Sequence, residues 1–173
     1  MTPSGHPIHL EGSVPAQSFT AFGVVIDHRS GRRGGMDEWV QAFAEVWSAP
    51  RRELDRLMAL LAPDIVLVAP TRPPRSVGQA EARLAFERAF RAMPDLHATV
   101  ARWSATGDVL FIEMTFHATI GGRQVSWNSV DRILFRDGHA VERAAFFNPT
   151  RVRRAFTRNL RAIAQFLRFR IGR

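Results

Sequence analysis

The chain of 173 residues contains no cysteine, no lysine and no tyrosine, and each absence excludes a kind of chemistry. Without cysteine there is no disulfide, no thiolate nucleophile and no thiolate metal ligand. Without lysine there is no Schiff base, no anchor for pyridoxal phosphate and no P-loop lysine. Without tyrosine there is no phenol to donate a proton. Acid–base chemistry is therefore left to aspartate, glutamate and histidine.

Long hydrophobic runs are also missing. No apolar run approaches the roughly 20 residues that span a bilayer. Met1–Val14 has neither a basic start nor an apolar centre, so it does not read as a secretory signal. We therefore expect a cytoplasmic protein. With 46% hydrophobic residues, the chain can form one domain with a core, together with extensions.

The net positive charge is confined to one end of the chain. All 24 basic residues are arginine, and residues 149–173 hold eight of them without any acidic residue. Residues 1–148 balance 16 arginines against 16 acidic residues. The net charge of +8 therefore describes a tail, and we do not expect the main domain to bind nucleic acid.

The segment Gly107–Pro149 alternates apolar and polar residues and is interrupted by Gly121-Gly122 and Asp137-Gly138. Period-two alternation with such turn pairs is the strongest local signal of an antiparallel meander. The three strands predicted here are Val109–Ile120, Arg123–Phe135 and Ala140–Phe147.

Helices precede this meander. Apolar residues at helical spacing predict helices over Asp37–Ser48, Arg51–Leu61 and Val77–Met93. Two further strands are predicted over Ile65–Ala69 and Leu96–Ser104. The first part, residues 1–35, reads as an extension rich in Pro, Gly and Ser, in which Phe19–Asp27 could add an edge strand. Met36, just before the first helix, is a hypothetical native start.

The basic tail, residues 150–173, predicts one amphipathic helix over Thr150–Phe169. Its apolar stripe is Val152, Phe156, Leu160, Ile163 and Leu167, and its basic face is Arg151, Arg154, Arg158, Arg161 and Arg168. Such a helix either lies on an anionic membrane or acidic partner, or docks its apolar stripe on the domain or on a second subunit.

Over residues 36–149, the order of the predicted helices and strands and the turns between them resemble the nuclear-transport-factor-2-like superfamily. This superfamily includes SnoaL-like polyketide cyclases and ketosteroid isomerases. The matching phrases are Leu57–Asp64, Gly78–Phe90, Met93–Asp95, Trp103, and Trp127 followed by Val130–Gly138 and Glu142–Pro149. The resemblance implies an α+β fold in which a cone-shaped, curved, mostly antiparallel sheet packs on three helices around an apolar pocket. It also implies a homodimer, which would cover the broad outer face of the sheet.

Asp131 is the first candidate catalytic residue. It shares a strand face with apolar residues, so it belongs either to a pocket or to a structural hydrogen bond with Arg123, Arg132 or a backbone amide. The resemblance implies the oxyanion-hole aspartate of the isomerases, an acid kept neutral by an apolar site. The isomerase base would fall near Ala69, which cannot take a proton, and the tyrosine partner is missing. A standard steroid isomerase is therefore not expected.

The remaining candidates are a histidine, an asparagine and five aromatic residues. His117 is either the acid–base partner of Asp131 or, as alternation favours, part of an outward polar face. Asn148 stands where SnoaL-like cyclases commonly have an aspartate, and it can hydrogen-bond but cannot act as a base. Aromatic residues that either line a pocket or pack in the core are Trp39, Phe43, Trp103, Trp127 and Phe146. No cluster has metal-ligand spacing, so no metal and no cofactor is expected.

The sequence thus predicts a SnoaL-like enzyme for cofactor-independent acid–base chemistry, such as isomerisation, cyclisation or dehydration, on a hydrophobic oxygenated small molecule. The alternative is a non-catalytic ligand-binding or dimeric interaction module of the same fold. In that case the basic helix would attach it to an anionic membrane or partner.

Overall fold

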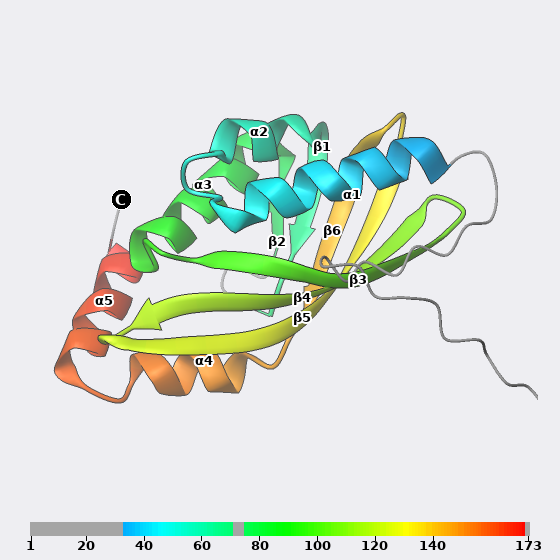
Figure 1. Cartoon of the computed structure of the whole chain (residues 1–173). Helices are drawn as coiled ribbons and strands as arrows, with labels where there is room; N and C mark the ends of the chain where they lie inside the picture. The colour runs from blue at the N-terminus through cyan, green and yellow to red at the C-terminus, as the bar shows by residue number, and fades with distance from the viewer. Residues whose placement is uncertain (1–32, 71–74, 172–173) are drawn as a thin grey trace, which may run out of the picture.

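The computed structural model of the chain describes residues 33–70 and 75–171 (Figure 1). The hypothetical strand Phe19–Asp27 lies outside these residues. Five helices are described: α1 (Arg33–Ser48), α2 (Leu54–Ala59), α3 (Gly78–Ala92), α4 (Pro149–Phe156) and α5 (Leu160–Ile171). Six strands are described: β1 (Leu61–Val68), β2 (Arg75–Val77), β3 (His97–Thr106), β4 (Val109–Ile120), β5 (Arg123–Arg136) and β6 (His139–Phe146).

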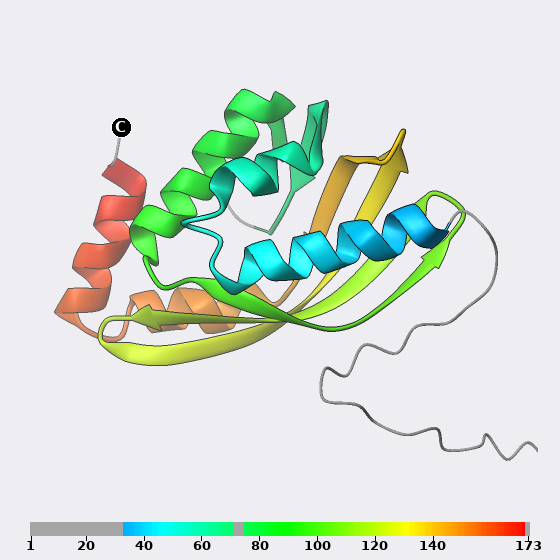
Figure 2. The ribbon, with the colours of Figure 1, turned by 45° about the horizontal axis from the view of Figure 1, so that its top comes forward.

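The strands form one curved sheet in the order β2-β1-β6-β5-β4-β3. Neighbouring strands are antiparallel except β1 and β6, which are parallel. The helices α1, α2 and α3 lie over the concave face of the sheet, whereas α4 and α5 lie at one end of the molecule (Figures 1 and 2). This is the predicted α+β architecture, with an open sheet wrapped around helices.

The alternation of β4 explains how the sheet is oriented. Leu110, Ile112, Met114 and Phe116 are buried on the concave side, and the intervening residues are partly or fully exposed. Aromatic residues of α1 pack onto this surface, since the ring of Trp47 meets that of Phe116 edge-on at 5.2 Å between centroids. Burial of apolar area on both layers is the main stabilising contribution to such a fold.

Most boundaries differ from the prediction by one or two residues, and α2 is shorter than predicted at both ends, since it begins at Leu54 and not at Arg51. Helix α1 begins at Arg33, before Met36. Helix α2 ends at Ala59, and Leu61 already belongs to β1, because the carbonyl of Leu60 accepts hydrogen bonds from Trp39 Nε1 and from the amide of Ala140. The short strand β2 was not predicted. It forms by pairing with β1.

The tail folds as two helices and not as one. Asn159 interrupts it: its Oδ1 accepts from the amide of Ala162, and its Nδ2 donates to the carbonyl of Gly121 in the β4–β5 turn. Gln165 then donates to the carbonyls of Ala92 and Thr119 and accepts from the amide of Gly121. The tail therefore docks on its own domain, where a second apolar cluster forms from Ile120, Ala155, Phe156 and Ala162.

Gly121 is expected to be sensitive to substitution because the tail docks on it. Its φ is +61°, and a β-carbon would lie 2.7 Å from Cβ of Ala162 and 2.8 Å from Oδ1 of Asn159. We expect Gly121→Ala to lower the free energy of unfolding by about 2–4 kcal/mol, from left-handed strain plus overpacking. Gly122→Ala is the matched control. Gly122 also has a positive φ, +82°, but an added β-carbon there would meet no atom within 4 Å apart from its chain neighbours. Urea denaturation would measure both, and equal losses would contradict the docking contact.

No helix among residues 33–70 and 75–171 combines the length and the apolar character needed to cross a bilayer.

Candidate functional site

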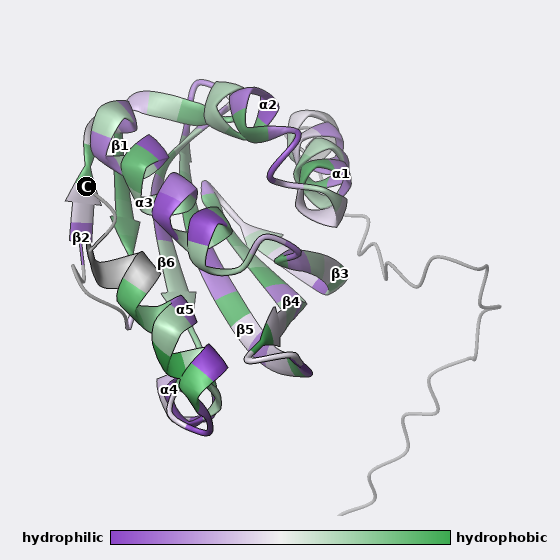
Figure 3. Cartoon of the chain, turned by 90° about the vertical axis from the view of Figure 1, so that its left-hand side faces the viewer, coloured by the Kyte–Doolittle hydropathy of each residue, from purple (hydrophilic) through white to green (hydrophobic). Residues whose placement is uncertain are grey.

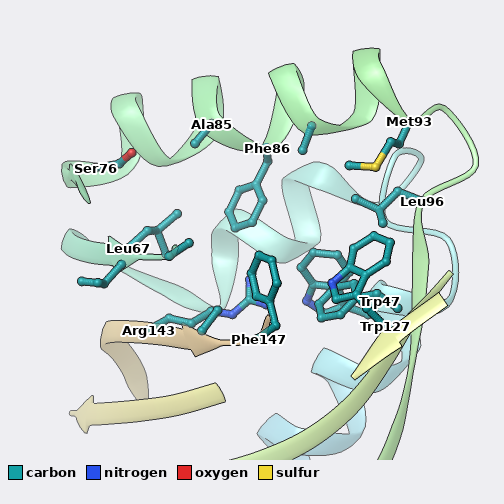
Figure 4. Close-up of a pocket in the computed structure, with 15 residues that line it drawn as sticks. Trp47, Leu67, Ser76, Ala85, Phe86, Met93, Leu96, Trp127, Arg143 and Phe147 are labelled. Atoms are coloured by element: carbon teal, nitrogen blue, oxygen red, sulfur yellow. The ribbon is translucent and has the colours of Figure 1, made fainter. Parts of the chain in front are cut away.

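A cavity of about 200 Å³ lies between α3 and the concave face of the sheet (Figure 4). Its wall is mostly apolar and aromatic. The large residues that line it come from α1, α3, the segment before β3, β4, β5 and the end of β6: Trp47, Phe86, Met93, Leu96, Phe116, Trp127 and Phe147. Such a concave, apolar and partly open space is typical of a small-molecule site.

Arg143 is the one charged side chain among the described residues that line this cavity. It is 7% exposed, and its guanidinium carbon lies 4.9 Å from the ring centroid of Trp47 and 5.3 Å from that of Phe43. At these distances the ring faces attract the cation. The side chain is thus held in an aromatic box on the sheet side of the cavity.

Asp131 neutralises this arginine. Nε and Nη2 of Arg143 approach Oδ2 of Asp131 at 2.7 and 2.6 Å, and Oγ of Ser129 donates to Oδ1 at 2.8 Å. In the ladder Asp131 is opposite Ala145 and Arg143 is opposite Ile133, so the two side chains meet on a diagonal of β5 and β6. The ion pair leaves Nη1 of Arg143 outside it.

This geometry places Asp131 differently from the oxyanion-hole role that the resemblance implied. Asp131 is fully buried, accepts hydrogen bonds on both oxygens, and is not among the cavity-lining residues. Its partner is Arg143, and neither Arg123 nor Arg132; Arg132 pairs instead with Glu142. The group that faces the cavity is therefore Arg143, with Asp131 and Ser129 behind it.

The structure does not bring His117 to Asp131. His117 lies on the outer face of β4, where its ring stacks on that of His97 at 5.1 Å. Asp131 lies on the concave face, opposite Ile112 of the same strand β4. A hydrogen bond between two groups on opposite faces of one sheet is geometrically impossible.

Of the predicted pocket residues, Trp127 lines the cavity. Trp39 is buried in the core, and Phe43 touches Arg143 from behind the cavity wall. The other three lie away from the cavity. Trp103 packs partly buried on β3, Phe146 is 57% exposed on the outer face, and Asn148 caps α4 by accepting from the amide of Thr150.

The polar side chains of the residues that line the cavity are mainly hydrogen-bond donors. Nε1 of Trp47 is buried and has no hydrogen-bond partner among the described atoms, and an indole N–H can only donate. Arg143 also only donates, while the buried hydroxyl of Ser76 can do both. No aspartate, glutamate or histidine lines the cavity within the described residues. Sequence reasoning missed Trp47, Phe86, Phe116, Arg143 and Phe147 as cavity residues.

Comparison with protein families identifies the class. The family model of the SnoaL-like domain matches residues 38–143 of this sequence, which is more than half of the chain. The chain therefore belongs to the SnoaL-like domain family, in agreement with its curved sheet and mostly apolar cavity. A comparison with curated protein sequences found no match.

Solved structures agree on the fold. A candidate SnoaL-like polyketide cyclase from Jannaschia sp. CCS1 superposes with a TM-score of 0.68 at 17% identity, covering 77% of this chain and 99% of that one. An NTF2-like protein of unknown function from Burkholderia pseudomallei K96243 has a TM-score of 0.64 at 23% identity, with 71% and 98% covered. TerC, co-crystallised with polyporic acid, has a TM-score of 0.63 at 16% identity, with 70% and 97% covered.

Proposed function

We propose that this protein is a small-molecule enzyme that binds an apolar, oxygenated ligand in the cavity, with a ligand oxygen at Arg143. The observation that carries the proposal is the buried Arg143, held by Asp131 at the wall of an otherwise apolar cavity. A donor-rich wall is matched by a ligand whose oxygens accept, such as a carbonyl, an enolate or a phenolate. Polyporic acid, with which TerC was co-crystallised, is consistent with an acidic apolar ligand in this fold.

Arg143 would act by electrostatic stabilisation. A fixed N–H donor in a water-poor site stabilises negative charge that develops on a ligand oxygen in the transition state. Asp131 and Ser129 would be positioning residues, because they orient the guanidinium without touching the ligand. Isomerisation, cyclisation and dehydration of carbonyl compounds all pass through such an oxyanion, so Arg143 would stabilise the oxyanion in this reaction class, while the proton would be taken up by water or by a group of the ligand itself.

A second candidate, a binding protein without catalysis, is favoured by one observation. Within the described residues the cavity wall has no carboxylate and no histidine to accept a proton. Incubation of a bound carbonyl compound in D₂O separates the two functions. An enzyme of this class would speed deuterium incorporation next to the carbonyl, whereas a binding protein would not.

Ligand binding is the first expected result. In a thermal-shift screen of polyketide fragments, terpenoids and steroids, a ligand is expected to stabilise the wild type and to quench the fluorescence of Trp47 and Trp127. We expect Arg143→Lys to weaken binding by about tenfold or more, because lysine loses the planar donor pair. Arg136→Lys is the control, since Arg136 is exposed and pairs with Asp64. Equal affinity of Arg143→Lys and wild type would contradict the role of Arg143.

The homodimer stays a prediction. Three large apolar side chains are exposed on the outer face of the sheet, namely Phe111 at 42%, Val130 at 42% and Phe146 at 57%. Val130 and Phe146 are directly paired in the ladder. A second subunit on this face would remove them from water.

A further inference from the structure

Helix α5 is apolar on two opposite faces. Its inner face docks on the domain through the buried Ala162 and through Gln165, which hydrogen-bonds to Ala92, Thr119 and Gly121. Its outer face carries Leu160, Ile163 and Leu167, which are 84%, 41% and 46% exposed. These three recur at the i, i+3, i+7 spacing of a single helical stripe. An ordinary surface helix would have polar residues there.

The predicted continuous stripe of the tail is thus divided by the turn at Asn159. Val152 and Phe156 of α4 point into the domain, whereas the apolar residues of α5 point away from it. Seen from that end, α5 is the nearest element and no other described element covers it (Figure 3). The outer stripe of α5, meaning Leu160, Ile163 and Leu167, is therefore accessible along its whole length.

Positive charge lies near the outer stripe of α5. Arg158 and Arg161 lie on either side of Leu160 in the chain and are exposed. The exposed arginines of α4 are Arg151, Arg153 and Arg154. Residues 149–173 contain no acidic residue that could offset this charge. An apolar stripe beside an all-arginine surface is matched by a partner that is both anionic and apolar.

We propose that α5 attaches the protein to an anionic membrane surface, with its outer stripe in the interfacial region and its arginines on lipid phosphates. A second copy of this chain fits less well, since a symmetric contact would bring two acid-free basic segments together. Nucleic acid fits less well because the stripe is aliphatic and offers no ring for base stacking. The attachment would be peripheral, as α5 has only 12 residues.

The docking of α5 gives this attachment a defined orientation. Because Gln165 ties the helix to α3 and to the β4–β5 turn, the domain would sit in a fixed pose on the lipid. Met93 packs against the tail cluster and also lines the cavity. The end of the cavity at Met93 would therefore lie nearest the membrane. Attachment through α5 does not depend on what the cavity binds.

Vesicle flotation of the full chain tests the proposal. Phosphatidylcholine vesicles with and without phosphatidylglycerol would be compared at low and high salt. We expect binding only to the anionic vesicles and weakening with salt. Leu160→Asn with Ile163→Asn, and separately Arg158→Gln with Arg161→Gln, should each reduce binding by about tenfold or more, since each arginine near an anionic surface contributes roughly fivefold.

The controls use the same residue types elsewhere on the surface. Leu84 is a helical leucine with 48% exposure on α3, so Leu84→Asn should leave binding unchanged. Arg51→Gln with Arg52→Gln removes two exposed arginines from the α1–α2 turn and should also leave it unchanged. Thermal melts would verify that each variant is folded. The proposal is overturned if the wild type does not float with anionic vesicles at low salt. It is also overturned if the control pairs weaken binding as much as the α5 pairs, or if the α5 pairs change only self-association in sedimentation velocity.

Discussion

Replacing Asp131 with asparagine is expected to lower the free energy of unfolding by about 3–5 kcal/mol, because a buried guanidinium loses its counter-charge. Asp131 is 0% exposed and Arg143 is 7% exposed, so solvent cannot replace the missing partner. The hydrogen bond from Ser129 would also be altered, since an amide offers one acceptor oxygen in place of two. Urea denaturation followed by tryptophan fluorescence would measure the change.

Two variants control for this interpretation. Asp64→Asn removes an ion pair with Arg136 that is exposed on both sides, and we expect little change in stability. The double variant Asp131→Leu with Arg143→Met removes both charges, and it should be more stable than Asp131→Asn because no charge is left buried alone. If Asp131→Asn unfolds at the same urea concentration as Asp64→Asn, the pair does not have the structural role assigned to it.

Much of the fold could be predicted because its signals are local. The alternation of Val109–Ile120 and the turns Gly121-Gly122 and Asp137-Gly138 specify the meander, and β4 has the predicted bounds. The start of β1 was wrong because Leu61 has helical spacing with the residues of α2, while the structure pairs it with Ala140. That contact is remote in sequence, and tertiary pairing overrides local propensity.

The tail also shows that a contact remote in sequence can override a local pattern. The predicted stripe continues without interruption across Thr157–Asn159, so periodicity alone indicates one helix. The break depends on the side chain of Asn159, which binds the β4–β5 turn at Gly121. Only the folded hairpin brings that carbonyl close. The N-cap of α5, in which Asn159 accepts from the amide of Ala162, is a local signal that the periodicity of the apolar stripe does not reveal.

The acidic residue of the site, Asp131, could be predicted from the sequence, but its cationic partner Arg143 could not. Asp131 was singled out because a carboxyl on an apolar strand face needs a partner or a pocket. Its partner Arg143 could not be chosen among many arginines, since the pairing depends on the diagonal between β5 and β6 and on the register shift near Leu134. The outward position of His117 followed from alternation, which was the stronger of its two interpretations.

Filling the cavity should abolish ligand binding without unfolding the protein. Ala89 lies on α3 and lines the cavity, so Ala89→Phe would place a ring in the space of about 200 Å³. A ligand at a hundred times its Kd stabilises a protein by about 2.7 kcal/mol, and we expect this stabilisation to fall to near zero in the variant. The unliganded variant should lose about 1–3 kcal/mol at most, the usual cost of overpacking.

Leu84→Phe is the matched control, because it adds an aromatic ring to the same helix at an exposed position outside the cavity. Its ligand-induced thermal shift should equal that of the wild type. A shift retained by Ala89→Phe would place the ligand elsewhere on the molecule. A shift lost in Ala89→Phe but retained in Arg143→Lys would keep the cavity as the binding site and remove the arginine from recognition. Only loss in both variants, with Leu84→Phe unaffected, connects the apolar space to the buried cation, as catalysis at a ligand oxygen requires.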